Sequence, residues 1–139
     1  MSGDADDAVL VERGPVTTVT LNRPERRNAL SREVTAGLNA ALDVVEESDA
    51  RCLVLRGAGG AFSAGGDIER MRERIEDDDD LDGRVRELER STAGMLARLV
   101  ELPIPTVAKI DGPAVGAGAN LAIGKIGRAS CRERVCQYV

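Results

Sequence analysis

The sequence predicts an α/β fold in which helices connect the strands of a single sheet. Three kinds of pattern lead to this prediction: short apolar runs of strand length, longer segments with apolar residues at helical spacing, and glycine-rich turns that join the two. Along the chain these patterns follow the order ββαβααβα. Strands that alternate with helices in this way are typical of helical crossovers within one sheet.

The first three elements lie near the N-terminus. Residues 8–14 and 16–22 are short strand patterns separated by Gly14 and Pro15, which indicates a hairpin. A turn-rich loop follows and ends at Ser31, whose hydroxyl is suited to cap a helix. The helix itself is predicted from apolar residues that recur every three or four positions: Val34, Leu38, Ala41, Leu42 and Val45.

The remaining elements alternate between strands and helices. Residues 51–57 form a continuous apolar run, which predicts a strand buried on both faces, and residues 106–110 predict a second buried strand. Between them we expect a helix from about Asp67, then an acidic loop, and then a helix near 84–101 that carries Met95 and Leu99. A glycine-rich turn after the second strand enters a further helix.

Composition excludes several kinds of site. The 139 residues include no histidine, which rules out Ser-His-Asp triads and histidine-ligated metals, and the three cysteines lack zinc-binding spacing. We therefore expect no metal. A net charge of −5 disfavours nucleic acid and anionic membranes as partners. No apolar run approaches a membrane span and the polar N-terminus does not resemble a signal peptide, so we expect a cytoplasmic protein.

Two segments share one arrangement: residues 52–68 and 106–123 each contain a strand, then a glycine/alanine turn, then a helix start. A helix start has backbone N–H groups without partners and a partial positive charge, and glycine lets a substrate approach the backbone closely. Two such starts can direct two N–H groups at one oxygen, as in an oxyanion hole. From the pattern alone, a phosphate or nucleotide site and plain close packing remain the alternatives.

Three motifs also resemble those of the crotonase superfamily, the enoyl-CoA hydratase/isomerase family. They are LNRPERRNALS at 21–31, GGAFSAGGDI at 59–68 and PIPTVAKIDGPAVGAGANLAI at 103–123, and the similarity spans residues 8–124. The resemblance implies a spiral of ββα units, truncated here, with residues 1–124 as the N-terminal part of the domain. It also implies an acyl-CoA thioester substrate, no cofactor apart from the coenzyme A of that substrate, and a homotrimer or hexamer for the intact protein.

The resemblance assigns roles to individual residues. The N–H groups of Gly66 and Ala117 would form an oxyanion hole that polarises the thioester carbonyl, so that an enolate-like intermediate can form. Arg26 and Arg27 would meet the phosphates of coenzyme A, with a surface role as the alternative. Asp67 is more suited to cap its own helix than to catalyse. The path of the adenine and pantetheine groups would be lined by Ala64, Gly65, Gly66, Asp67 and Ile68.

Asn120 departs from the family pattern. Hydratases that this chain resembles have a glutamate at this place and a second glutamate beyond residue 139. Asparagine does not titrate and cannot act as a general base, so a two-carboxylate hydratase mechanism is in doubt. Isomerisation of a double bond needs only one acid. One alternative is a non-catalytic member of the family that binds acyl-CoA or fellow subunits. A weaker alternative is a nucleotide-binding α/β domain.

Residues 125–139 differ from the chain before them. They contain two of the three cysteines, and four basic side chains stand against one glutamate, a net charge of +3 within an acidic protein. The segment lacks helical periodicity and resembles the translation of a short-read sequencing adapter. We therefore predict a non-native tail that packs poorly, with a basic surface tail as the alternative. Because the second acid would lie outside the chain, we expect that the chain does not turn over crotonyl-CoA.

Overall fold

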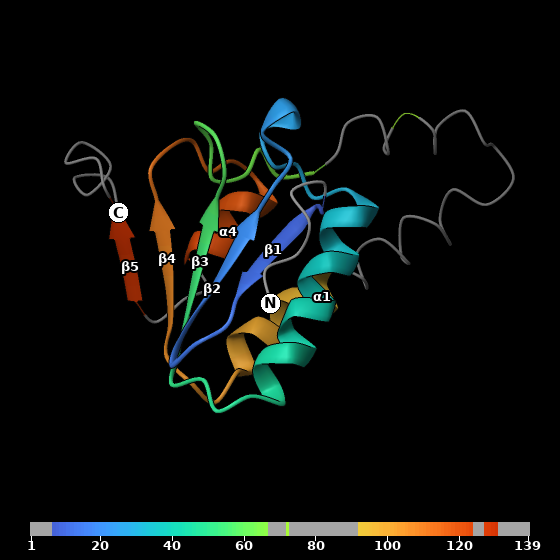
Figure 1. Ribbon diagram of the computed structural model, residues 1–139. Helices are drawn as coiled ribbons and strands as arrows, with labels where there is room; N and C mark the ends of the chain where they lie inside the picture. Colours follow the sequence, from blue (N-terminus) through green and yellow to red (C-terminus); the bar gives the residue numbers. More distant parts are fainter. Residues whose placement is uncertain (1–6, 67–71, 73–91, 124–126, 131–139) are drawn as a thin grey trace, which may run out of the picture.

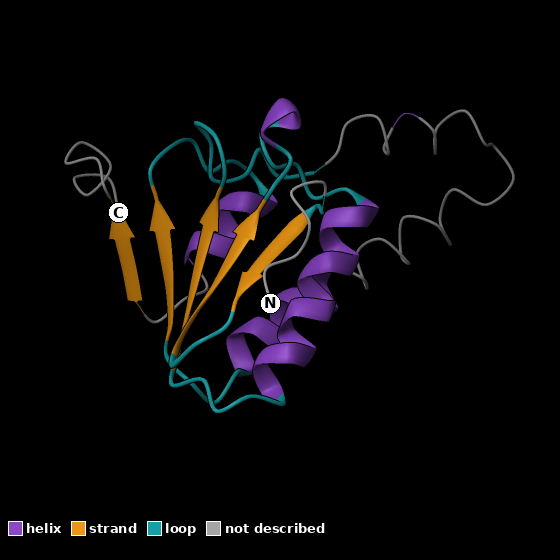
Figure 2. Ribbon diagram, viewed as in Figure 1, coloured by secondary structure: helices purple, strands orange, loops and turns teal. Residues whose placement is uncertain are grey.

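The computed structural model describes residues 7–66, 72, 92–123 and 127–130, and these form one five-stranded sheet with helices packed against it (Figures 1 and 2). The strands follow one another across the sheet in chain order. They are β1 (Val9–Glu12), β2 (Val16–Leu21), β3 (Cys52–Gly57), β4 (Thr106–Ile110) and β5 (Gly127–Ser130).

The pairing of the strands brings the carboxyl ends of β2, β3 and β4 to the same edge of the sheet. β1 and β2 are antiparallel neighbours, which confirms the hairpin predicted at Gly14 and Pro15. β2, β3 and β4 are parallel, so the loops that follow Leu21, Gly57 and Ile110 leave the sheet at the same edge. Figure 1 shows these loops grouped at the upper ends of the strands. The glycine turns predicted from the sequence therefore start from neighbouring strands.

Only one face of the sheet is fully buried. Val19, Leu55 and Ala108 lie in register across β2, β3 and β4 and are at most 2% exposed, whereas Val54 and Val107 on the other face are half-buried. The prediction that residues 51–57 are buried on both faces is therefore wrong for the described residues. The reason is that the helices of this part of the chain pack on one side, and an apolar run does not itself show which faces are covered.

Helix α1 (Arg32–Glu46) begins and packs as the sequence predicts. The Ser31 hydroxyl accepts a hydrogen bond from the Val34 N–H at 3.2 Å, which satisfies one of the free donors at the helix start. The five apolar positions predicted for its inner face are all buried: Val34, Leu38, Ala41, Leu42 and Val45. They join the side chains of β2 and β3 in one core.

Residues 92–101 are helical and pack beside α1. Met95 and Leu99 enter the core, as predicted, while Arg98 on the outer side reaches across to α1. Arg98 donates hydrogen bonds to Asn39 Oδ1 at 3.1 Å and to Asp43 Oδ1 at 2.6 Å. The bond to Asp43 is the main cause that raises the pKa of the Arg98 guanidinium. The predicted helix start at Asp67 and the predicted acidic loop lie outside the described residues.

No helix among the described residues has the length and apolarity to cross a membrane.

Part of the predicted tail forms a strand. β5 pairs in parallel with β4, and Val107 lies opposite Gly127. The backbone of Gly127–Ser130 is therefore paired, and the poor packing of the tail stays a prediction. An open sheet edge presents unpaired backbone N–H and C=O groups, which a strand satisfies with its backbone whatever its side chains are. Whether residues 125–139 are a native continuation stays a prediction.

The substitution Leu38→Ala should lower the free energy of unfolding by about 2–5 kcal/mol, because Leu38 is 2% exposed and its removal leaves a cavity between α1 and the sheet. Urea unfolding followed by circular dichroism measures this change. Val100→Ala is the control, since Val100 is 59% exposed, and it should change stability by less than about 0.5 kcal/mol. Equal effects of the two substitutions would contradict the core described above.

Candidate functional site

The two glycine turns meet beyond the carboxyl ends of β3 and β4. Their backbones are joined by a bridge between Ser63 and Ala114. The N–H of Phe62 donates to the Pro113 carbonyl at 3.0 Å, and the N–H of Val115 donates to the Ser63 carbonyl at 3.0 Å. Phe62 and Ser63 are both fully buried. Backbone hydrogen bonds in both directions thus hold the turns side by side, as the sequence predicted for them.

Glycine is required where the turns touch. Gly65 has φ +84°, and a Cβ at this position would collide with the Val115 carbonyl oxygen and lie 3.1 Å from the Ala117 nitrogen. Gly118 lies against the first turn, where a Cβ would come within 2.7 Å of Ser63 Cβ. A side chain at either position would separate the two backbones. The bare backbone therefore brings Gly65, and with it the next peptide, next to Ala117.

Hydrogen bonds of the neighbouring carbonyl groups orient the N–H groups of Gly66 and Ala117. The Gly65 carbonyl accepts from the Leu30 N–H at 2.6 Å, and the Gly116 carbonyl accepts from the Asn120 N–H at 3.1 Å. In a trans peptide the C=O and the following N–H point in opposite directions, so the Gly66 N–H points away from Leu30. The Ala117 N–H likewise points out of the start of α4 (Ala117–Ile123).

Neither of these N–H groups donates a hydrogen bond to another residue that the structure describes. Gly66 is exposed and Ala117 is half-buried. Backbone N–H groups without an internal partner, such as those at a helix start, are suited to bind an oxygen that carries negative charge.

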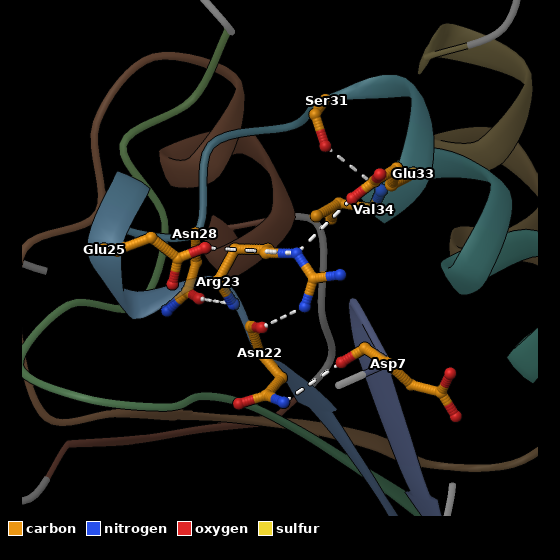
Figure 3. Close-up of polar contacts among 8 residues, drawn as sticks. All are labelled: Asp7, Asn22, Arg23, Glu25, Asn28, Ser31, Glu33 and Val34. Atoms are coloured by element: carbon orange, nitrogen blue, oxygen red, sulfur yellow. Dashed lines mark hydrogen bonds and ion pairs between the residues drawn. The ribbon is translucent and has the colours of Figure 1, made fainter. Parts of the chain in front are cut away.

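The loop between β2 and α1 is hydrogen-bonded to the first glycine turn through Asn28. Asn28 lies in the loop between β2 and α1, has φ 55° and is fully buried. Its amide nitrogen donates to the carbonyl groups of Ala58 and Ala61, both at 2.9 Å, and its Oδ1 accepts from the Arg23 N–H at 2.8 Å. Figure 3 shows the bond between Arg23 and Asn28. Asn28 thus fixes the first turn to the chain segment before α1.

Arg23 anchors that segment to the start of α1. Its Nε donates to Glu33 Oε2 at 3.3 Å, and its terminal nitrogen donates to the Asn22 carbonyl at 2.9 Å (Figure 3). Glu33 belongs to the first turn of α1, next to the Ser31 cap. The loop, the helix start and the first glycine turn therefore form one connected unit.

The predicted substrate-binding residues are partly gathered at this place. Gly65 is buried and Ala64 half-buried beside Gly66, and the Ala64 N–H donates to the Arg27 carbonyl at 2.8 Å. Arg26 ends a short 3₁₀ helix, η1 (Pro24–Arg26), and is exposed in the loop next to the first turn. Asp67 and Ile68 lie outside the described residues.

The side chains of α4 leave the chemistry of the site incomplete. Asn120 is exposed on this helix, one turn after Gly116, and supplies an amide in place of a carboxylate.

Asp111, which follows β4, has a buried Oδ1 without a hydrogen-bond partner in the described part of the chain. Sequence pattern alone does not distinguish Asp111, Asn28 or Ser63 as functional residues. Asn28 carried one usable signal, because asparagine is among the few residues that adopt positive φ readily.

A groove of about 410 Å³ lies elsewhere, between β1 and α1. Its walls include Val9, Val11, Gly37 and Ala41, and none of its lining residues belongs to either glycine turn. The candidate site is therefore a pair of backbone turns at the sheet edge, and it is distinct from this groove.

Comparison with known proteins now identifies the family. The family model for enoyl-CoA hydratase/isomerase matches residues 12–124. The chain belongs to this family. It is 44% identical over 116 residues to 1,2-epoxyphenylacetyl-CoA isomerase of Escherichia coli, covering 82% of this chain and 43% of that protein. It is 36% identical over 119 residues to enoyl-CoA hydratase EchA19 of Mycobacterium tuberculosis, covering 85% and 44%.

Solved structures of this family share the fold. The crystal structure of an enoyl-CoA hydratase/isomerase from Xanthobacter autotrophicus Py2 matches with a TM-score of 0.78 and 32% identity, over 88% of this chain and 45% of that one. AtuE of Pseudomonas aeruginosa matches with a TM-score of 0.80 and 34% identity, over 88% and 47%. The crotonase-like α/β fold is therefore confirmed, and the chain spans about half the length of its relatives.

The substitution Gly65→Ala should destabilise the protein by about 1–3 kcal/mol, because it adds a Cβ at positive φ and against the Val115 carbonyl. Gly60→Ala is the matched control in the same turn, since nothing lies within 4 Å of a Cβ there, and it should change stability by less than about 0.5 kcal/mol. Thermal unfolding of the two variants measures the difference. If Gly65→Ala unfolds like the wild type, the close contact between the turns is wrong.

Proposed function

We propose that this chain carries the oxyanion hole of an acyl-CoA-processing enzyme. The N–H groups of Gly66 and Ala117 would both donate to the thioester carbonyl oxygen and stabilise the negative charge that develops there as an enolate forms. The observation that supports this most is the adjacency of the two turns, with neither N–H bonded to a described residue. Membership of the enoyl-CoA hydratase/isomerase family agrees with an acyl-CoA substrate.

The coenzyme A portion would lie along the first turn. Ala64, Gly65 and Gly66 would line the path toward the carbonyl, with Asp67 and Ile68 continuing it. Arg26, exposed in the neighbouring loop, would meet the phosphates, because a guanidinium pairs well with phosphate oxygens. No separate cofactor enters this proposal, since coenzyme A is part of the substrate.

The reaction we propose is the movement of a proton between carbons of the acyl chain, as in an isomerase. Asn120 supplies no titratable group, so hydration that needs a carboxylate at this position is disfavoured. The Escherichia coli relative is also named an isomerase, although the substrate in its name, 1,2-epoxyphenylacetyl-CoA, carries an epoxide. The acid that accepts and returns the proton would come from outside residues 1–139.

We also propose that the intact protein assembles as a homotrimer or hexamer.

Binding of an acyl-CoA labelled with ¹³C at the thioester carbonyl tests the hole directly. On the wild-type chain we expect the infrared carbonyl band to fall below its frequency in free solution, because two hydrogen bonds polarise the C=O group. Ala117→Val should abolish most of this shift by blocking access to the donor. Ala119→Val, two residues further along α4 and also half-buried, is the control and should keep it. An unshifted band in the bound wild-type complex would refute the oxyanion hole.

We expect this chain not to convert crotonyl-CoA at a measurable rate, even where it binds the thioester, because Asn120 stands at the place where proton transfer needs an acid. Loss of enoyl-thioester absorbance measures the reaction, with free crotonyl-CoA as the blank. Turnover would show that an acid within residues 1–139 suffices. Tight binding of ATP or NAD without affinity for acyl-CoA would instead favour a nucleotide-binding domain.

A further inference from the structure

Ser63 occupies the junction of the three segments that build the candidate site. Its hydroxyl donates to the Asn28 carbonyl at 2.8 Å and accepts from the Gly65 N–H at 3.2 Å. Its backbone carbonyl accepts from the Val115 N–H at 3.0 Å, and its side chain lies against Gly118. The residue is fully buried, so water does not compete for these bonds.

The Ser63 hydroxyl holds the peptide between Ala64 and Gly65, one peptide before the one that carries the Gly66 N–H. Binding the Gly65 N–H fixes the orientation of the peptide between Ala64 and Gly65, and the Leu30 N–H fixes the next peptide through the Gly65 carbonyl. Two consecutive peptide planes are thus held by partners inside the protein. The Gly66 N–H, which belongs to the second of these planes, donates to no residue that the structure describes.

Resting on the proposed function, we infer that the Ser63 hydroxyl is a positioning residue for the oxyanion hole. It sets the direction of the Gly66 N–H relative to the Ala117 N–H by tying the first glycine turn to the Asn28 loop. Ser63 does not touch the substrate; it acts through the backbone of Gly65. Since a preorganised donor costs no reorganisation when charge develops, the loss of this bond weakens polarisation of the carbonyl more than it weakens ligand binding.

The same infrared measurement separates positioning from folding. Ser63→Ala should lose most of the carbonyl band shift of the bound ¹³C-labelled acyl-CoA, while the dissociation constant stays within about threefold, because the coenzyme A contacts are unchanged. Ser48→Ala is the matched control. The Ser48 hydroxyl also donates to a carbonyl, that of Val45, at 2.8 Å, and accepts from a backbone N–H, that of Ala50, at 3.2 Å, but it lies beyond the far end of α1.

A second variant addresses folding. Ser63→Cys keeps the shape of the side chain but offers only a weak donor, so it should fold and still lose most of the band shift. The inference is overturned if Ser63→Ala or Ser63→Cys binds acyl-CoA with the full wild-type shift, or if both variants unfold, which would make Ser63 a residue of the fold alone. An unshifted band in the wild-type complex would refute the hole itself and the inference with it.

Discussion

The contact between the two glycine turns is the constraint on which the candidate site depends. It needs two buried residues, Phe62 and Ser63, whose backbone groups bond to the second turn, and it needs the absence of side chains at Gly65 and Gly118. With these conditions met, the backbones of two segments some 50 residues apart come into contact. The arrangement uses backbone donors alone, so it is independent of pH.

The sheet makes this contact possible by placing the turns on adjacent parallel strands. β3 and β4 pair in register from Leu53 with Thr106 to Arg56 with Lys109, so their carboxyl ends finish together. On the buried face of the sheet, α1 packs against β1 and β2, and α4 packs against β4. Functional loops are commonly positioned by rigid strands, and here the strands position two glycine-rich turns.

The polar side chains that follow β4 bear on the chemistry open to the candidate site. Asn120 offers hydrogen bonds but no proton transfer, and Asp111 carries a buried carboxylate oxygen with no described partner. Family membership therefore establishes the kind of enzyme to which the chain belongs, whereas its reaction stays a proposal. Fold and reaction are separate inferences in this family, as in any fold that supports several activities.

The sequence by itself determined the features that depend on near neighbours along the chain. The apolar spacing of α1, the Ser31 cap, the hairpin at Gly14 and Pro15 and the three family motifs were all predictable, because their causes lie within a few residues. Tertiary structure alone decided how Asn28 bonds to Ala58 and Ala61, since those partners are 30 and 33 residues away. It also decided that the sheet is fully buried on one face and that Gly127–Ser130 pairs with β4. Periodicity reports that a side chain is apolar, but which surface covers it, and which distant carbonyl a buried amide meets, is set only when the segments pack together.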